Sequence, residues 1–208
     1  MFKGMMQRIG LLLLLLLINF SSLTAQNSSV IGKEVNDFSL RKTNGQFVAL
    51  HDYADAKGFI IVFTCNHCPF AKLYTKRLNG LHGQFAEKGV PVLAINAMDS
   101  VQYEAETFTH MQEKAKQEKY KFPYLQDATQ MVGKLFGAQH TPQAFVIWKT
   151  KNGKYQIRYS GAIDDNGENP RKAIPYIANA VAQLLEGKEV STPETPSFGC
   201  RIFYRKLP

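Results

Sequence analysis

The hydrophobic and polar positions along the chain predict alternating strands and helices. A continuous apolar run at Phe59–Thr64 is typical of a strand that is buried on both faces, and Val90–Ala97 repeats this pattern. Between the two runs, apolar residues recur at steps of three and four, which predicts one helix from Phe70 that stops at Gly89. Because a helix joins the two strands, we expect them to be parallel, with a right-handed crossover.

Two hairpins are predicted, each at an Asn-Gly step. Asn44-Gly45 lies between two short apolar stretches near the beginning of the domain, and Asn152-Gly153 separates the strands Ala144–Trp148 and Tyr155–Tyr159. Asn-Gly between apolar runs favours a tight turn, so the strands of each pair should be antiparallel.

Three further helices are expected. Asp99 and Asp127 are each followed three residues later by glutamine, which resembles a capping box, and the second of these helices should stop at Gly137. Apolar residues at helical spacing from Ile174 to Leu185 predict a last helix, closed by Gly187. The order of elements predicts an α/β fold with a mixed sheet.

The first 25 residues have the pattern of a secretory signal peptide. Lys3 and Arg8 precede an apolar run that contains seven consecutive leucines, and small polar residues lead to a cleavage point near Ala25. The apolar run, at about twelve residues, is short for a membrane span. An uncleaved anchor is the alternative, because Leu23 is bulky where a small residue is usual.

The remaining chain is expected to form one domain. Residues 26–187 have the length of a single domain, and the proline-containing residues 188–208 should lie over its surface as a C-terminal extension. Because the predicted signal peptide would direct export and then be removed, we expect a periplasmic or secreted protein without stable membrane insertion after cleavage.

The charged residues give no sign of nucleic-acid binding. The net charge is +8, but the basic residues are spread along the chain, and those at Lys114, Lys116, Lys119 and Lys121 alternate with glutamates as on a solvated helix face. No basic and aromatic recognition motif accompanies them.

The three cysteines are too few for a disulfide scaffold, and their odd number leaves at least one thiol unpaired within the chain.

Cys65 and Cys68 are the strongest candidates for chemistry. They stand two residues apart, directly after a predicted strand and at the start of a predicted helix. Unpaired N–H groups at a helix start favour a thiolate, and the pKa of a cysteine there can fall to about 3.5–7.5. We expect Cys65 to attack a partner as a thiolate and Cys68 to resolve the mixed disulfide.

His67, between the two cysteines, is expected to add to this effect. A protonated or hydrogen-bonding imidazole would stabilise the Cys65 thiolate and make the disulfide more oxidising. A static disulfide is the structural alternative, but the short loop between the cysteines would contribute little stabilisation. A zinc site is not expected, because there is one cysteine pair and no two of the five histidines have ligand spacing. No cofactor is expected either.

Several phrases together resemble the thioredoxin-like superfamily, and within it the alkyl hydroperoxide reductase/thiol-specific antioxidant, or redoxin, branch. The resemblance covers nearly all of residues 30–187, and the phrases that carry it are NDFSL, NGQFVAL, FTCNHCPF, VPVLAINAMDS, KFPYLQDATQMVGKLFGAQHTPQAFVI and YSGAIDD. It implies a thioredoxin fold with three α/β/α layers and a mixed central sheet, to which the first hairpin is an N-terminal extension.

The resemblance also implies a role for Thr141 and Pro142. In thioredoxin-like proteins the matching proline is cis and lies beside the cysteine pair, so that the backbone of Thr141 is free to pair with a substrate peptide. The chain departs from thioredoxins at Thr64, where they have tryptophan, and the strand before Cys65 has no aspartate. The general base is therefore unassigned, and water or His67 would take that part.

Three other functions are left open by the sequence. Peroxiredoxins have a proline and a threonine or serine at fixed steps before the reactive cysteine, and neither Cys65 nor Cys68 has this register, which favours disulfide exchange over a thiol peroxidase. A copper-handling chaperone would use Cys65, Cys68 and His140, since soft thiolates and imidazole suit copper. An interaction module with incidental cysteines is the third.

The sequence thus predicts a thiol–disulfide oxidoreductase whose partners are protein or small-molecule thiols and disulfides. Cys65, Cys68, His67 and Pro142 are the predicted catalytic residues, and Thr141 and His140 are the predicted substrate contacts. Cys200 lies in a phrase, PSFGC, that resembles the C-terminus of the redoxin branch, and we expect it to be inert, as a small buried hydrophobe.

Overall fold

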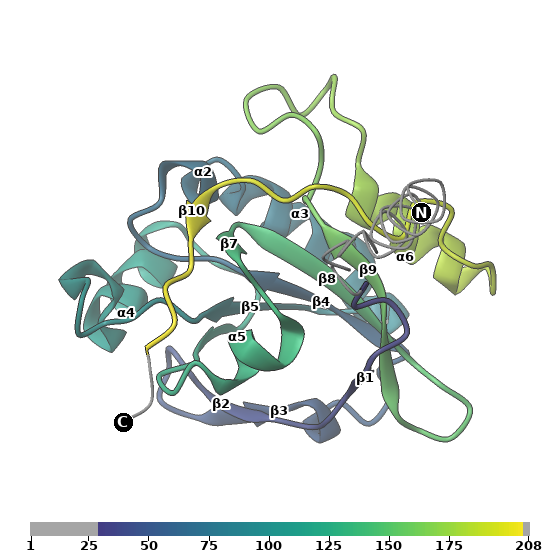
Figure 1. The fold of residues 1–208 in the computed structure, drawn as a ribbon, viewed down its shortest axis with the longest axis horizontal. Coiled ribbons are helices and arrows are strands. Elements are labelled where there is room, and N and C mark those ends of the chain that lie inside the picture. Colours follow the sequence, from purple (N-terminus) through teal and green to yellow (C-terminus); the bar gives the residue numbers. More distant parts are fainter. Residues whose placement is uncertain (1–28, 206–208) are drawn as a thin grey trace, which may run out of the picture.

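A computed structural model describes residues 29–205, so the predicted signal peptide and its cleavage point lie outside the described residues. The main sheet has eight strands in the order β1-β9-β8-β4-β5-β6-β2-β3 (Figure 1). These strands are β1 (Glu34–Val35), β2 (Ser39–Lys42), β3 (Phe47–Ala49), β4 (Gly58–Phe63), β5 (Val92–Asn96), β6 (Tyr124–Gln126), β8 (Gln143–Lys149) and β9 (Tyr155–Gly161). The α-helices among the described residues are α2 (Pro69–Lys72), α3 (Thr75–Phe85), α4 (Phe108–Gln117), α5 (Met131–Phe136) and α6 (Tyr176–Leu185).

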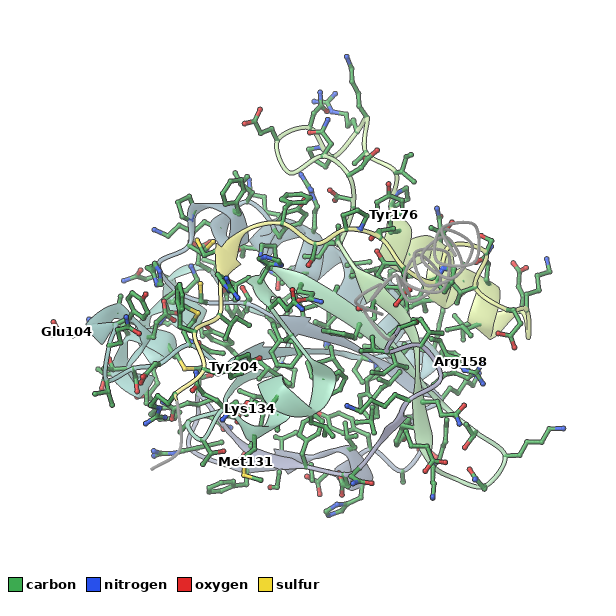
Figure 2. All side chains as sticks on the ribbon, in the orientation of Figure 1. Glu104, Met131, Lys134, Arg158, Tyr176 and Tyr204 are labelled. Carbon is green, nitrogen blue, oxygen red and sulfur yellow. The ribbon has the colours of Figure 1, made fainter. Side chains whose placement is uncertain are left out.

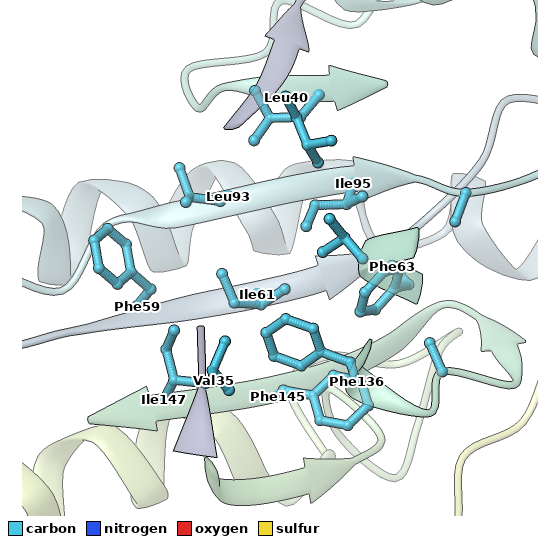
Figure 3. Close-up of a cluster of buried hydrophobic side chains, with 14 of the residues drawn as sticks. Val35, Leu40, Phe59, Ile61, Phe63, Leu93, Ile95, Phe136, Phe145 and Ile147 are labelled. Carbon is cyan, nitrogen blue, oxygen red and sulfur yellow. The ribbon is translucent and has the colours of Figure 1, made fainter. Parts of the chain in front are cut away.

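Alternate residues of the central strand β4 supply two cores, one on each face of the sheet. Phe59, Ile61 and Phe63 point to one face, where Phe136 of α5 packs on Phe63 (Figure 3). Ile60 and Val62 point to the other face, which α3, α4 and α6 cover. Every residue of β4 is buried, as the continuous apolar run predicts for a strand covered by helices on both sides.

The predicted strand pairings are confirmed. β4 and β5 are parallel, β8 and β9 are antiparallel, and β2 and β3 form the N-terminal hairpin. The short strands β1 and β6 were not predicted. β6 has three residues, and it joins the hairpin to the sheet by pairing with β5 on one side and β2 on the other. So short a strand has no periodic pattern that could be recognised in the sequence.

The predicted helix from Phe70 is divided into α2 and α3 at Leu73 and Tyr74. Gly89 does end this unit, in the left-handed conformation with φ of 83°. The helix predicted to begin at Asp99 is wrong. The chain there makes turns and a 3-10 helix, η4 (Glu104–Glu106), and α4 begins only after Thr107. The Asp99 carboxylate instead accepts a hydrogen bond from the amide of Val101 at 2.9 Å, a local turn that competes with helix formation.

The other predicted helices need smaller corrections. Gln130 is the N-cap of α5 in a left-handed conformation, while the Asp127 carboxylate accepts the amide of Gly133 at 2.8 Å, so Asp127 caps the helix without the predicted box. Gly137 ends α5 as predicted, with φ of 68°. The last helix begins after Pro175, which leaves Ile174 exposed.

The C-terminal extension does more than lie over the surface. Cys200–Arg201 forms a strand, β10, that pairs antiparallel with β7 (His140–Thr141) in a second, two-stranded sheet (Figure 1). Ile202, the next residue, is 3% exposed and packs into the core. None of the helices in residues 29–205 is long and apolar enough to cross a membrane.

Candidate active site

Cys65 and Cys68 lie just beyond the carboxyl end of β4, in the centre of the sheet. Cys68 is the N-cap of α2, and Pro69 is the first residue of that helix, where its missing N–H costs no hydrogen bond. Both cysteines are free thiols with no exposed surface. The helix that follows the pair has only four residues, because the helical path is interrupted before α3 begins. The sulfurs therefore interact with individual hydrogen-bonding groups and not with the N-terminus of the long helix that the sequence predicts.

Thr141 contacts both sulfurs. Its Oγ1 lies 3.1 Å from the Sγ of Cys65, and its carbonyl oxygen accepts a hydrogen bond from the Sγ of Cys68 at 3.1 Å. The peptide bond between Thr141 and Pro142 is cis, as the resemblance implies, and both residues are buried. The structure thus brings four of the predicted site residues together.

The two thiols have unequal electrostatic surroundings. A hydrogen bond given to Cys68, burial, and the nearby Glu106 carboxylate raise the pKa of Cys65. Hydrogen bonds from Cys65, from Cys200 and from the amide of Ala71 lower the pKa of Cys68. The lower pKa of the pair therefore belongs to Cys68, whereas the sequence predicts the low pKa for Cys65.

Glu106 organises the loop between the cysteines. Its carboxylate has no exposed surface and accepts hydrogen bonds from the amides of Asn66 and His67 at 2.9 to 3.0 Å, and from the Asn96 side chain at 2.6 Å. Buried carboxylates of this kind are costly to leave unpaired, so the interactions fix the loop. Sequence analysis missed Glu106, because it lies 40 residues from Asn66 in a short 3-10 helix without a recognisable pattern.

His67 is held by Glu106. Its Nδ1 lies 2.5 Å from the Glu106 carboxylate, and its ring stacks on Tyr103 with centroids 5.1 Å apart. Cys65, His67 and Glu106 each place one ligand-type atom within 4.8 Å of the others, so the imidazole is close to the Cys65 sulfur. Its strongest contact is nevertheless with the carboxylate, which the sequence does not predict.

Lys114 also reaches the cysteine loop. The sequence places it on a solvated helix face, but its side chain is half-buried and its Nζ donates to the carbonyl of Asn66 at 3.4 Å. Burial lowers the pKa of this amine. Lys114 thus places an amine beside the same loop that the Glu106 carboxylate holds.

His140 is placed differently from the other predicted site residues. It lies in β7 beside Thr141, but its Nδ1 contacts the hydroxyl of Ser197 at 2.9 Å. Within residues 29–205, the group of side chains that could share a metal ion is Cys65, His67 and Glu106, and His140 is not part of it. The predicted copper site with His140 as third ligand therefore has no support from this geometry.

Cys200 is the third thiol of the site. Strand β10 places it opposite Thr141, where it is half-buried and near Cys68. Burial and the neighbouring Cys68 raise the pKa of Cys200. The sequence places Cys200 135 positions after Cys65 and contains no pattern that would bring the two together.

Several known proteins are similar to this chain in sequence or in structure. The chain is 28% identical over 131 residues to the thiol-disulfide oxidoreductase ResA of Bacillus thuringiensis subsp. konkukian, covering 63% of this chain and 70% of that protein. A hypothetical protein from Sinorhizobium meliloti has a similar structure with a TM-score of 0.76 at 32% identity, over 86% of this chain and 97% of that chain. A putative thioredoxin from Neisseria meningitidis shares the fold, with a TM-score of 0.56 at 19% identity over 76% of this chain and 93% of that chain.

These likenesses confirm the predicted thioredoxin-like α/β fold. The AhpC/TSA family matches residues 31–165, which contain the two cysteines of the pair and the cis-proline. This span is more than half of the 208 residues. The chain therefore belongs to the AhpC/TSA family.

Proposed function

We propose that the protein is an exported thiol–disulfide oxidoreductase that exchanges disulfides through Cys65 and Cys68. The observation that carries the proposal is the pair of free thiols that contact Thr141, the residue before the cis-proline Pro142. The relative ResA, whose name gives this activity, supports the same reaction class.

The proposed reaction needs no cofactor. A thiolate of the pair attacks one sulfur of a partner disulfide, forms a mixed disulfide, and releases the other partner sulfur as a thiolate. The second cysteine of the pair loses its proton and attacks the mixed disulfide, which forms the Cys65–Cys68 disulfide and frees the first partner sulfur. The partner gains two electrons and two protons, and the reverse sequence oxidises a partner dithiol.

The different pKa shifts of the two thiols bear mainly on which cysteine attacks the partner first. The sequence favours Cys65 as the attacking sulfur, whereas the raised pKa of Cys65 and the lowered pKa of Cys68 favour Cys68. Cys65→Ser and Cys68→Ser, each combined with Cys200→Ser so that the third thiol cannot resolve the mixed disulfide, separate the two assignments. The variant that accumulates a stable mixed disulfide with a partner retains the attacking cysteine and lacks the resolving one.

The activity is tested by incubating the reduced full chain with oxidised glutathione, quenching with acid, alkylating, and mapping the peptides without reduction. We expect a Cys65–Cys68 disulfide, and a loss of catalysed insulin reduction by at least about a hundredfold in each serine variant. Glu104→Ala, an exposed change in the same 3-10 helix as Glu106, is the matched control and should behave as wild type.

Two results would contradict the proposal. One is that Cys65 and Cys68 remain free thiols under these conditions. The other is that the protein turns over hydrogen peroxide with a Cys65- or Cys68-dependent rate while disulfides do not react, which would favour the peroxidase alternative. Export is a separate part of the proposal, supported by the pattern of residues 1–25, and it is checked by the N-terminal sequence of the protein recovered from outside the cytoplasm.

A further inference from the structure

Residues 191–205, which we name the C-terminal strap, occupy the backbone edge beside the cysteine pair. β10 in the strap pairs antiparallel with β7, and Cys200 is opposite Thr141 in this register. Gly199 approaches so closely, with φ of 137°, that a Cβ at this position would lie 2.2 Å from the carbonyl oxygen of Thr141. The strap therefore fills the position in which the sequence analysis places a substrate peptide.

The strap is fixed on the side that precedes Cys200. The amide of Ser160 donates to the carbonyl of Pro193 at 2.9 Å, and the amide of Thr195 donates to the carbonyl of Ser160 at 3.1 Å. The hydroxyls of Tyr159 and Thr195 are 2.7 Å apart. Phe198 then contacts Phe70 of α2 edge to face.

The strap is also fixed on the side that follows Cys200. The amide of Ile202 donates to the carbonyl of Gln139 at 2.8 Å, and the Tyr204 hydroxyl donates to the carbonyl of Ala138 at 2.7 Å. Figure 2 shows Tyr204 beside Lys134 of α5, whose Nζ lies 5.8 Å from the centre of the ring. With attachments on both sides, the position of Cys200 is defined by the fold.

All three cysteines contact Thr141, Cys65 and Cys68 through their sulfurs and Cys200 through its carbonyl oxygen. The Thr141 hydroxyl lies 3.1 Å from the Sγ of Cys65 and 3.4 Å from the carbonyl oxygen of Cys200, and the Thr141 carbonyl accepts from the Sγ of Cys68. Cys68 lies near both other thiols, since Cys65 and Cys200 each lower its pKa. The Cys200 side chain is half-buried, whereas the other two are fully covered.

We propose that Cys200 is a third redox-active cysteine, which exchanges with the Cys65–Cys68 disulfide by forming a disulfide with Cys68. This inference rests on the proposed function of the pair. It differs from the sequence-based expectation that Cys200 is inert, because the strap presents this thiol to Cys68 as an internal substrate.

The exchange step balances within the chain. Cys200 loses its proton, and its sulfur attacks the Sγ of Cys68 in the Cys65–Cys68 disulfide. The bond between Cys65 and Cys68 breaks, the bond between Cys68 and Cys200 forms, and Cys65 takes up the proton. One disulfide is present before and after the step, so no external oxidant or reductant is consumed.

The test uses full-length Cys65→Ser, which retains only Cys68 and Cys200. The reduced variant is incubated with oxidised glutathione, quenched with acid, alkylated with N-ethylmaleimide, and mapped by mass spectrometry without reduction. We expect a Cys68–Cys200 disulfide, the loss of both free thiols, and no retained glutathione. A chain in which Cys200 is alkylated, or in which glutathione stays on either cysteine, would overturn the proposal.

A matched control moves the strap thiol by three residues. In Cys65→Ser with Cys200→Ser and Ser197→Cys, the new thiol faces His140 instead of Cys68, so no internal disulfide should form. A disulfide of equal yield in this control would show that any strap cysteine reacts, and would overturn the specific placement of Cys200. Cys65→Ala provides a second background, with the same expected and contradicting results, if the serine variant folds poorly.

Failure of this inference can be told apart from failure of the proposed function. Cys200→Ser retains Cys65 and Cys68, and it should still form their disulfide when oxidised by glutathione. If it does so while Cys65→Ser forms no Cys68–Cys200 disulfide, only the role of Cys200 is wrong. If Cys65 and Cys68 also stay free in Cys200→Ser, the proposed function is wrong.

Discussion

Residues 64–68 and the C-terminal strap meet at the three thiols, and they are held there in different ways. The cysteine loop follows β4, a strand that is buried at every residue, and the carboxylate of Glu106 accepts hydrogen bonds from two consecutive amides of this loop. The strap is largely exposed, apart from Ile202, and it is attached by hydrogen bonds at a few points on either side of Cys200.

This difference indicates that the cysteine loop is the fixed side of the site, whereas the C-terminal strap is the removable side, which can open locally. Moving the cysteine loop would leave the buried Glu106 carboxylate without its hydrogen-bond donors, which costs about 3 kcal/mol. Moving the strap exposes backbone groups that water can satisfy, so its local opening should need much less free energy than global unfolding. A partner can therefore reach the buried pair if the strap opens, while the loop keeps its geometry.

The largest expected effect comes from breaking the fixed side with Glu106→Ala. The amides of Asn66 and His67 and the Asn96 side chain would lose their acceptor in a buried position. We expect the free energy of unfolding to fall by about 3 kcal/mol, measured by urea denaturation of the reduced protein. The exposed neighbour Glu104 is the control, and Glu104→Ala should change the stability by less than about 0.5 kcal/mol. Equal losses in the two variants would show that the loop does not depend on Glu106.

An intermediate effect is expected from breaking the removable side with Gly199→Ala. The added Cβ would collide with the Thr141 carbonyl, and the backbone there has φ of 137°. We expect a loss of about 2 kcal/mol, together with alkylation of Cys68 that is faster by about tenfold, because the strap no longer covers it.

Gly153→Ala separates the collision from the cost of the backbone conformation. Gly153 also has positive φ, of 82°, but no atom lies within 4 Å of the position that a Cβ would take there, and it is in the turn between β8 and β9. This control should lose stability without faster alkylation of Cys68. If both variants leave the alkylation rate unchanged, the strap does not control access to the pair.

The last expected effect is a pH dependence of stability, because groups from both segments lower the pKa of Cys68. Its pKa is lower in the folded protein than in the unfolded chain, so the folded protein binds fewer protons between the two values. The reduced protein should therefore become more stable as the pH rises towards the pKa of an unfolded thiol, about 8.5, and lose this contribution as the pH falls through the lower, folded value.

This contribution is isolated by comparing wild type with Cys68→Ser. Urea denaturation of both reduced proteins between about pH 5 and pH 8 should show a stability difference that increases with pH by up to about 1.4 kcal/mol per unit. Parallel profiles would mean that Cys68 has the same pKa in the folded and unfolded chains. The donors from Cys65 and Cys200 would then not stabilise its thiolate.

Much of the fold follows from local patterns in the sequence. The apolar run of β4 predicts a strand covered on both sides, and the Asn-Gly steps predict the two hairpins. These patterns are readable because hydrophobic burial and turn geometry act over a few neighbouring residues. The incorrect helix start at Asp99 shows the limit, since an aspartate can bind its own turn as well as cap a helix.

The sequence by itself determined the family, the strand that carries the cysteine pair, and the proline that lies beside it. Only the tertiary structure decided which groups surround the sulfurs. Glu106 and Cys200 reach the pair from segments 40 and more than 100 residues away in the chain, so no local pattern announces them. The same contacts raise the pKa of Cys65 and lower that of Cys68, because burial and hydrogen bonding depend on what packs around a group and not on its position in a motif.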